Sequence, residues 1–160
     1  MYHKRFARLP LRIAFVEGLV EQRHPSLDHA LELLAQVREG AEARALSLAA
    51  CVVDAGGHII ASQRMDGTAL GAMRLAVGKA YTAVLWGAAT RSFMQSTQPG
   101  GEDWGWNATD DRIVVYAGGV PLYDGEELVG GLGASGGTAE QDEECVAAAA
   151  LAVGFVVEAP

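Results

Sequence analysis

The residues best suited to hold a ligand lie in a glycine-rich stretch near the C-terminus. Segment 129–144 reads VGGLGASGGTAEQDEE, which is typical of a strand that ends in a turn from which a helix begins. Free backbone amides at such a helix start bind anions, so Ser135, Gly136, Gly137 and Thr138 are candidates for holding a carboxylate. The four acids that follow would repel a diphosphate. The alternative interpretation is a tight strand-to-helix turn without a ligand.

Lys79 is the candidate cation for the same site. It lies on a largely apolar helix expected over 69–88, where an unpaired buried ammonium would be costly. It therefore needs either a ligand carboxylate or an acidic partner. Asp54, in a turn, and Arg64 and Asp66, at a strand end, are the nearby candidates. They either line one pocket with Lys79 or form an ion network that fixes a hairpin on the helix; Asp54 alone could instead accept hydrogen bonds from turn amides.

Other catalytic or metal-binding patterns are missing from the sequence. The four histidines form no HxH or HExxH motif, so we predict no metal site. His58 follows a Gly-Gly turn and is expected to face solvent or cap a hairpin. Cys51 and Cys145 lie in apolar runs, and we expect reduced core thiols of a cytoplasmic protein.

The charge of the chain restricts its partners. The 160 residues contain 12 Lys and Arg against 20 Asp and Glu, a net charge of −8. Nucleic acids and anionic membranes need a basic surface, so neither is an expected partner. Residues 1–12 nevertheless carry four bases and no acid. Residues 1–25 are therefore predicted to be an N-terminal extension, either a frayed tail or an arm that packs on an acidic neighbouring subunit.

The hydrophobic pattern places these residues on a single α+β domain over 26–156. Ser26 is a plausible N-cap, Asp54 to Gly57 form a hairpin turn, and Thr138 with Gln141 fits a capping box. The predicted order is α-β-β-α-α-β-β-β-α with one antiparallel sheet. Its elements are a helix from Ser26, a hairpin over 46–65, helices over 69–88 and after Thr90, a loop over 95–111, strands at 112–117, 119–123 and 127–134, and a helix from Thr138.

Two helices carry more apolar surface than one sheet can cover. The helix over 69–88 has Leu75 and Trp86 nearly opposite its main apolar face, and residues 145–153 contain no polar side chain. A helix that is apolar on every side is expected to be buried on every side. It is either wedged inside the domain or covered by another copy, and we predict a homo-oligomer, a dimer or a multiple of it.

Three sequence blocks together resemble one family. They are VVDAGGHIIASQRMDGT at 52–68, GKAYTAV at 78–84 with Thr90 beyond, and the segment 118–150 that contains GGVPLYDGEELVGGLGASGGT. In this order they resemble the GlcG/HbpS-like haem-binding family and the C-terminal domain of PduO-type corrinoid adenosyltransferases. The resemblance implies a five-stranded antiparallel sheet, oligomers, and haem as a cofactor. It also implies that Thr90 lies at the haem site.

Two functions from different classes follow from the sequence. The first is a binder of haem or of another small molecule that carries carboxylates, with Lys79, Thr90 and residues 135–138 around the ligand. The second is an enzyme acting on a small organic acid or lactone. In that case Asp54 or Asp66 would be the general base, and Lys79 or turn amides would hold an oxyanion. The sequence contains no clear nucleophile, which favours the binder.

Overall fold

The fold has three α-helices around a four-stranded sheet. It is taken from a computed structural model that describes residues 25–159. The prediction of an N-terminal arm falls outside this range, except for Pro25. The elements are α1 (Leu27–Glu42), β1 (Ala49–Asp54), β2 (Ile59–Arg64), α2 (Ala72–Trp86), the 3-10 helices η1 (Thr90–Phe93) and η2 (Trp106–Ala108), β3 (Gly119–Asp124), β4 (Glu127–Ser135) and α3 (Ala139–Val153).

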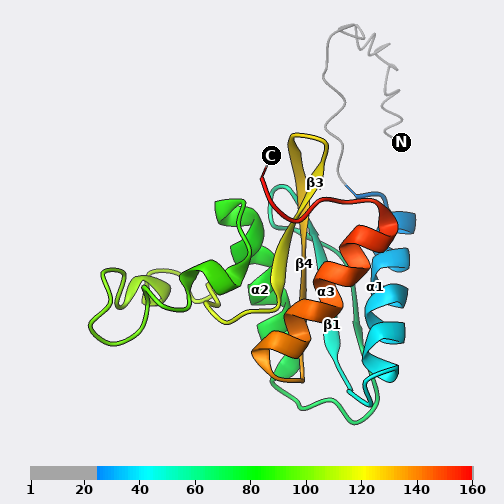
Figure 1. Cartoon of the computed structure of the whole chain (residues 1–160), viewed down its shortest axis with the longest axis horizontal. Helices are drawn as coiled ribbons and strands as arrows, with labels where there is room; N and C mark the ends of the chain where they lie inside the picture. The colour runs from blue at the N-terminus through cyan, green and yellow to red at the C-terminus, as the bar shows by residue number, and fades with distance from the viewer. Residues whose placement is uncertain (1–24, 160) are drawn as a thin grey trace, which may run out of the picture.

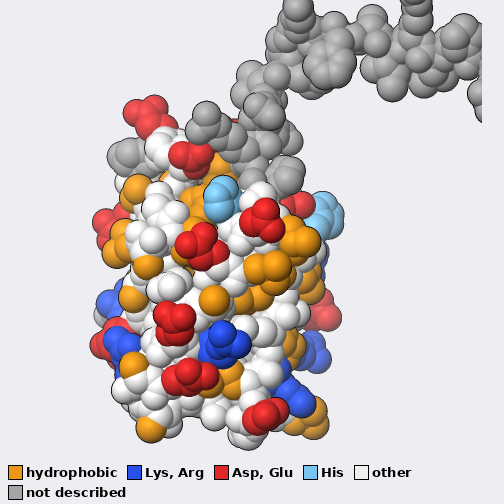
Figure 2. Space-filling view, turned by 90° about the vertical axis from the view of Figure 1, so that its right-hand side faces the viewer, with side chains coloured by type: hydrophobic (Ala, Val, Ile, Leu, Met, Phe, Trp, Pro, Cys, Tyr) orange, Lys and Arg blue, Asp and Glu red, His pale blue; other side chains and the backbone are white. Residues whose placement is uncertain are grey.

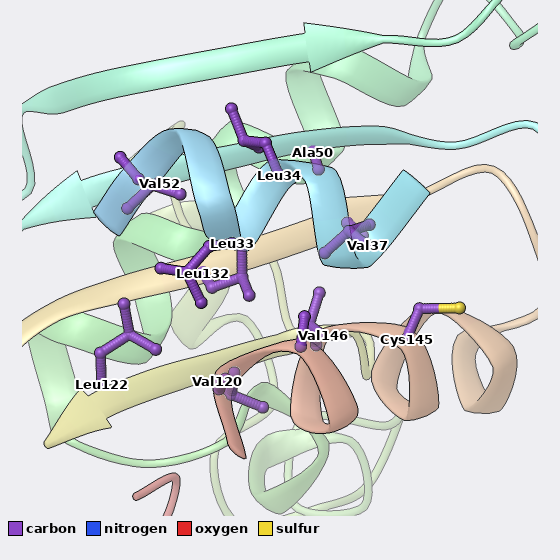
Figure 3. Packing of buried hydrophobic residues seen from close by; sticks show 14 of the residues in the cluster. Leu33, Leu34, Val37, Ala50, Val52, Val120, Leu122, Leu132, Cys145 and Val146 are labelled. Atoms are coloured by element: carbon purple, nitrogen blue, oxygen red, sulfur yellow. The ribbon is translucent and has the colours of Figure 1, made fainter. Parts of the chain in front are cut away.

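The sheet is antiparallel throughout and lies between two helical layers. Its strand order is β2-β1-β4-β3, and Figure 1 shows α1 and α3 on one face with α2 on the other. Because side chains alternate along a strand, Ala50 and Val52 of β1 pack with α1 and α3, as Figure 3 shows. Ala49, Cys51 and Val53 pack with α2. Central strand β1 is therefore buried on both faces, whereas edge strand β2 is partly exposed.

The single α+β domain agrees with the sequence prediction, but the fifth strand is wrong. No strand forms over residues 112–117. The backbone N–H of Val114 donates to Thr82 Oγ1 on α2 at 2.9 Å. A Cβ at Gly78 would come within 2.5 Å of the Val114 side chain. The segment thus packs along α2 through a side-chain hydrogen bond and does not pair with the sheet.

Local signals at the helix starts are mostly confirmed. Ser26 Oγ accepts a hydrogen bond from the backbone N–H of His29 at 3.1 Å, and the capping box of Thr138 with Gln141 forms in full. Thr90 is the first residue of the 3-10 helix η1, for which Ala89 is the N-cap. The expected loop after η1 contains the short helix η2 and projects away from the sheet in Figure 1.

Glycines of β4 let α2 lie directly on the sheet. A Cβ at Gly133 would come within 2.2 Å of the Ala76 carbonyl oxygen, and one at Gly131 within 2.6 Å of the Ala80 carbonyl oxygen. Such distances leave no room for a side chain. The glycine-rich sequence of this strand is therefore explained by helix–sheet contact.

The outer sides of the helices face solvent within one chain. Leu27 and Leu31 of α1 are more than half exposed, as is Leu151 of α3. Figure 2 shows the side of the molecule formed by α1 and α3, where hydrophobic side chains lie in small groups among charged ones. The alternative in which α3 is wedged inside the domain is therefore wrong, because Leu151 is exposed in the single chain. Cover by another copy stays a prediction. No helix in the range 25–159 is long and apolar enough to cross a membrane.

Candidate functional site

Lys79 is buried and paired, with a partner that the sequence analysis did not name. Its Nζ donates to Asp142 Oδ2 at 2.8 Å and to the Ala134 carbonyl oxygen at 2.9 Å. Both side chains of the ion pair are only 3% exposed. The pair joins α2, β4 and α3, so the ion network of Lys79 with Asp54 or Asp66 is wrong. Contact of Lys79 with a ligand stays a prediction.

The turn at 135–138 does not offer the free amides that we expected. The backbone N–H of Gly137 donates to Asp142 Oδ1 at 2.9 Å, and that of Thr138 donates to Gln141 Oε1 at 3.0 Å. Ser135 belongs to β4 and is buried; Gly136 has a φ of +142°. At Gly137 and Thr138 the amides are already used, which favours the structural interpretation of this turn.

The other acidic candidates lie at opposite ends of the first hairpin. Asp54 ends β1, whereas Asp66 follows Arg64, which pairs with Ala49 at the start of β1. Five residue steps along a strand correspond to roughly 17 Å. Arg64 and Asp66 instead line a polar groove with Arg38 and Glu42. A single pocket that contains Asp54, Asp66 and Lys79 is therefore wrong. An enzyme that uses only one of these two acids as general base stays a prediction.

The hydroxyl of Thr90 holds the backbone that leads into β3. Thr90 is fully buried. Its Oγ1 donates to the Tyr116 carbonyl oxygen at 2.7 Å and accepts from the backbone N–H of Gly119 at 3.0 Å. A role at a haem site stays a prediction, but in this structure the hydroxyl is occupied by protein partners.

A pair that the sequence analysis missed lies at the β1–β2 turn. Asp54 Oδ1 accepts hydrogen bonds from the backbone N–H groups of Gly56 at 2.8 Å and His58 at 2.9 Å. His58 Nδ1 lies 3.3 Å from both carboxylate oxygens of Asp54. Partial burial raises the pKa of Asp54, but the amides and the His58 ring together lower it below its ordinary value. The signal was the DAGGH sequence, because aspartate in a turn commonly binds backbone two residues on.

Tyr81 of α2 forms a platform beside this turn. Gly57, with a φ of +78°, packs so closely that a Cβ there would lie 2.7 Å from the Tyr81 ring. The Arg112 guanidinium lies 4.2 Å above the centre of the same ring. Asp110 accepts from Arg112 Nε at 3.0 Å and from its terminal nitrogen at 2.6 Å. These contacts fix Arg112 flat against the aromatic ring.

A groove of about 620 Å³ runs along α2. Val77, which lies one helical turn before Tyr81, is one of the residues that line it. Its walls are residues of α2 and of the segment that follows Asp110. Met73, Leu75, Val77 and Val114 supply apolar surface, and Arg74, Arg112 and Asp111 supply charge. Arg74 is exposed and has no acidic partner among the described residues. The groove therefore combines an apolar wall with an available cation.

No group of three His, Cys, Asp or Glu side chains within residues 25–159 could hold a metal ion.

Trp86, Phe93 and Trp106 form an aromatic cluster, with Trp86 and Trp106 ring centres 5.1 Å apart. Trp106 thus attaches the projecting loop to α2, while Trp104 is 63% exposed.

Fold and groove together define a small α+β domain with one apolar groove that carries a cation along α2. The chain belongs to the family described as haem degrading protein HbpS-like, which matches residues 26–151. It is 33% identical over 136 residues to the corrinoid adenosyltransferase PduO of Citrobacter freundii, covering 82% of this chain and 41% of PduO. The match therefore spans less than half of that transferase.

Two solved structures have the same fold. The PduOC:heme complex superposes with a TM-score of 0.81 at 30% identity, covering 85% of this chain and 99% of the other. A double mutant of HbpS from Streptomyces reticuli superposes with a TM-score of 0.81 at 26% identity, covering 92% and 99%. These relatives also have sheet and helices in common with this chain, which supports the fold derived above.

Proposed function

We propose that this protein binds haem. The observation that carries the proposal is its likeness, at 30% identity and over 85% of the chain, to a domain solved as a haem complex. Membership of the HbpS-like family supports the same function. The proposal is limited to binding, because the likeness to a haem complex supports binding alone.

The groove along α2 has the chemistry that haem needs. Haem is a planar, largely apolar ring with two propionate groups. A groove of about 620 Å³ lies within the range of about 300–1,000 Å³ typical of small-molecule sites. Met73, Leu75, Val77 and Val114 would contact the ring, and Arg74 would pair with a propionate. Bound haem would supply an iron centre that can take a protein ligand.

Native mass spectrometry of the purified chain mixed with haemin tests this function. We expect one haem per subunit, and a wild-type protein that retains none would contradict the proposal. Leu75→Glu places a charge in the groove and should reduce the haem-bound fraction. Leu70→Glu is the matched control, because Leu70 is 88% exposed and does not line the groove. Equal retention by all three proteins would place the haem elsewhere.

A homo-oligomer is part of the proposal. Leu85 and Trp86 on the outer side of α2 are 44% and 52% exposed, and Leu151 on α3 is 61% exposed. Clusters of exposed apolar side chains commonly mark protein contacts. A second copy of the chain that covers Leu85 and Trp86, at the end of α2 away from the groove, would remove this surface from water.

A cytoplasmic location is the last part of the proposal. Cys51 and Cys145 are both free and buried, and disulfides are rare in the cytoplasm. Burial raises the pKa of the Cys51 thiol to about 12, so this thiol is unreactive near neutral pH. Fractionation of the producing cells tests the location; recovery outside the cytoplasm would contradict it.

A further inference from the structure

His58 is held by its neighbours in a way that leaves one ring nitrogen available. Its side chain is 83% exposed, so solvent or a ligand reaches most of the ring. On the other side, Nδ1 lies 3.3 Å from both oxygens of Asp54. The carboxylate is itself fixed by the backbone amides of Gly56 and His58. The ring is therefore oriented from its Nδ1 side.

The Asp54 carboxylate determines which ring nitrogen of His58 carries the proton. An ionised carboxylate can only accept hydrogen bonds, and Asp54 Oδ1 already accepts from two backbone N–H groups. Nδ1 must therefore carry the proton that is donated to Asp54. In a neutral imidazole the other nitrogen, Nε2, then has the free lone pair. Within residues 25–159, Nε2 has no hydrogen-bond partner.

This arrangement is the one found around histidines that bind metals. A ligating histidine typically donates its second ring N–H to a carboxylate or carbonyl, which fixes the ring and makes the ligating nitrogen more basic. His29, the other histidine that the structure describes, has no such carboxylate. Its ring stacks edge-on against Phe155 at 5.8 Å.

The surroundings of His58 fit a planar ligand. Gly57, its neighbour in the chain, lies against the Tyr81 ring, and Arg112 lies on that ring as well. Val77 and Arg74 lie four and seven positions before Tyr81, so the three share one side of α2. Arg112 and Val77 line the groove. The aromatic ring of Tyr81, with Arg112 on it, therefore adjoins the turn that presents the imidazole, and the apolar groove follows about one helical turn further along α2.

We propose that His58 Nε2 is the protein ligand of the haem iron, with Asp54 as the residue that positions it. This inference rests on the haem-binding function proposed above and adds the identity of the iron ligand. Asp54 does not touch the haem. It holds the imidazole and, by accepting from Nδ1–H, strengthens donation from Nε2 to the iron.

Spectroscopy of haemin-loaded variants tests the assignment. His58→Ala is expected to lose the visible and electron paramagnetic resonance bands of a nitrogen-ligated iron and to bind haemin at least about 10-fold more weakly. Added imidazole should restore those bands. His29→Ala is the matched control and should behave as wild type. Circular dichroism should show all variants folded, because His58 is exposed.

Asp54 is tested separately from His58. Asp54→Asn retains an oxygen for the backbone amides of Gly56 and His58 but removes the negative charge. We expect nitrogen ligation to persist with a lower iron–histidine stretching frequency in the Raman spectrum of the reduced protein. An unchanged frequency would overturn the positioning role, because a residue that only stabilises the turn would not affect that bond.

Two negative results have different meanings. If wild type does not bind haemin, the proposed function fails and the ligand assignment fails with it. If wild type binds haemin and His58→Ala has the same bands and affinity, haem binding stands and His58 is not the ligand.

Discussion

Lys79 and Asp142 are 63 residues apart in the sequence, yet Lys79 Nζ and Asp142 Oδ2 lie 2.8 Å apart in the core. Lys79 Nζ also donates to the Ala134 carbonyl oxygen, and the Asp142 carboxylate also accepts from the Gly137 backbone N–H. A Cβ at Gly118 would come within 2.8 Å of Nζ. The contacts on every side fix the position of the ammonium between α2, β4 and α3.

Lys79→Met should therefore destabilise the fold. It leaves the Asp142 carboxylate buried without its cation, and breaking a buried ion pair in this way typically costs about 3–5 kcal/mol. Urea unfolding measures the loss. Arg91→Met is the matched control, because Arg91 pairs with Glu143 at the surface and such pairs contribute about 0–1 kcal/mol. Equal losses for both variants would contradict the role assigned to Lys79.

Gly133→Ala should also destabilise the protein, through helix–sheet contact. The added Cβ would come within 2.2 Å of the Ala76 carbonyl oxygen, so α2 must move away from the sheet. Overpacking of a core typically costs about 1–3 kcal/mol. Gly71→Ala is the control, since nothing lies within 4 Å of a Cβ there. Thermal unfolding that is the same for the two variants would contradict this packing.

Trp86→Glu should dissociate the oligomer without unfolding the subunit. Trp86 is 52% exposed, so the chain loses mainly its aromatic contacts with Phe93 and Trp106, each worth about 0.5–1.5 kcal/mol. Light scattering gives the mass and circular dichroism gives the folded state. A wild-type monomer at micromolar concentration, or a variant that keeps the wild-type mass, would contradict an interface at this residue.

The contact of Asp110 with Arg112 should persist to low pH. Hydrogen bonds from the Arg112 side chain and backbone lower the pKa of the Asp110 carboxyl from 3.8 to about 2. A carboxyl with a depressed pKa stabilises the fold above its unfolded pKa, and that contribution is lost as pH falls through the folded value. We expect the loss between about pH 4 and pH 2. Carboxyl NMR titration checks it: Arg112→Ala should return the Asp110 pKa toward 3.8, and no change would refute the contact.

The sequence predicted those features whose causes are local. The cap at Ser26, the turn from Asp54 to Gly57 and the box of Thr138 with Gln141 each depend on residues within four positions. The family resemblance, carried by three ordered blocks, is confirmed by the match over residues 26–151.

The errors came from contacts that the sequence does not reveal. The partner of Lys79 lies 63 positions away, and nothing in the sequence distinguished Asp142 from the acids around it. Residues 112–117 have an apolar pattern suited to a strand, but Thr82 takes the amide of Val114. The amides of the 135–138 turn seemed free because we expected Asp142 only to repel anions and Gln141 only to complete the capping box. In the structure both side chains accept hydrogen bonds from these amides.

Titration of the wild-type protein with haemin, followed at the Soret band, tests the central claim most directly. The account predicts a shifted Soret band whose intensity rises linearly with added haemin and stops rising at one haem per subunit. Iron-free protoporphyrin should not give the bands that come from iron ligation. A Soret band that keeps the position of free haemin and never saturates would contradict haem binding by this protein.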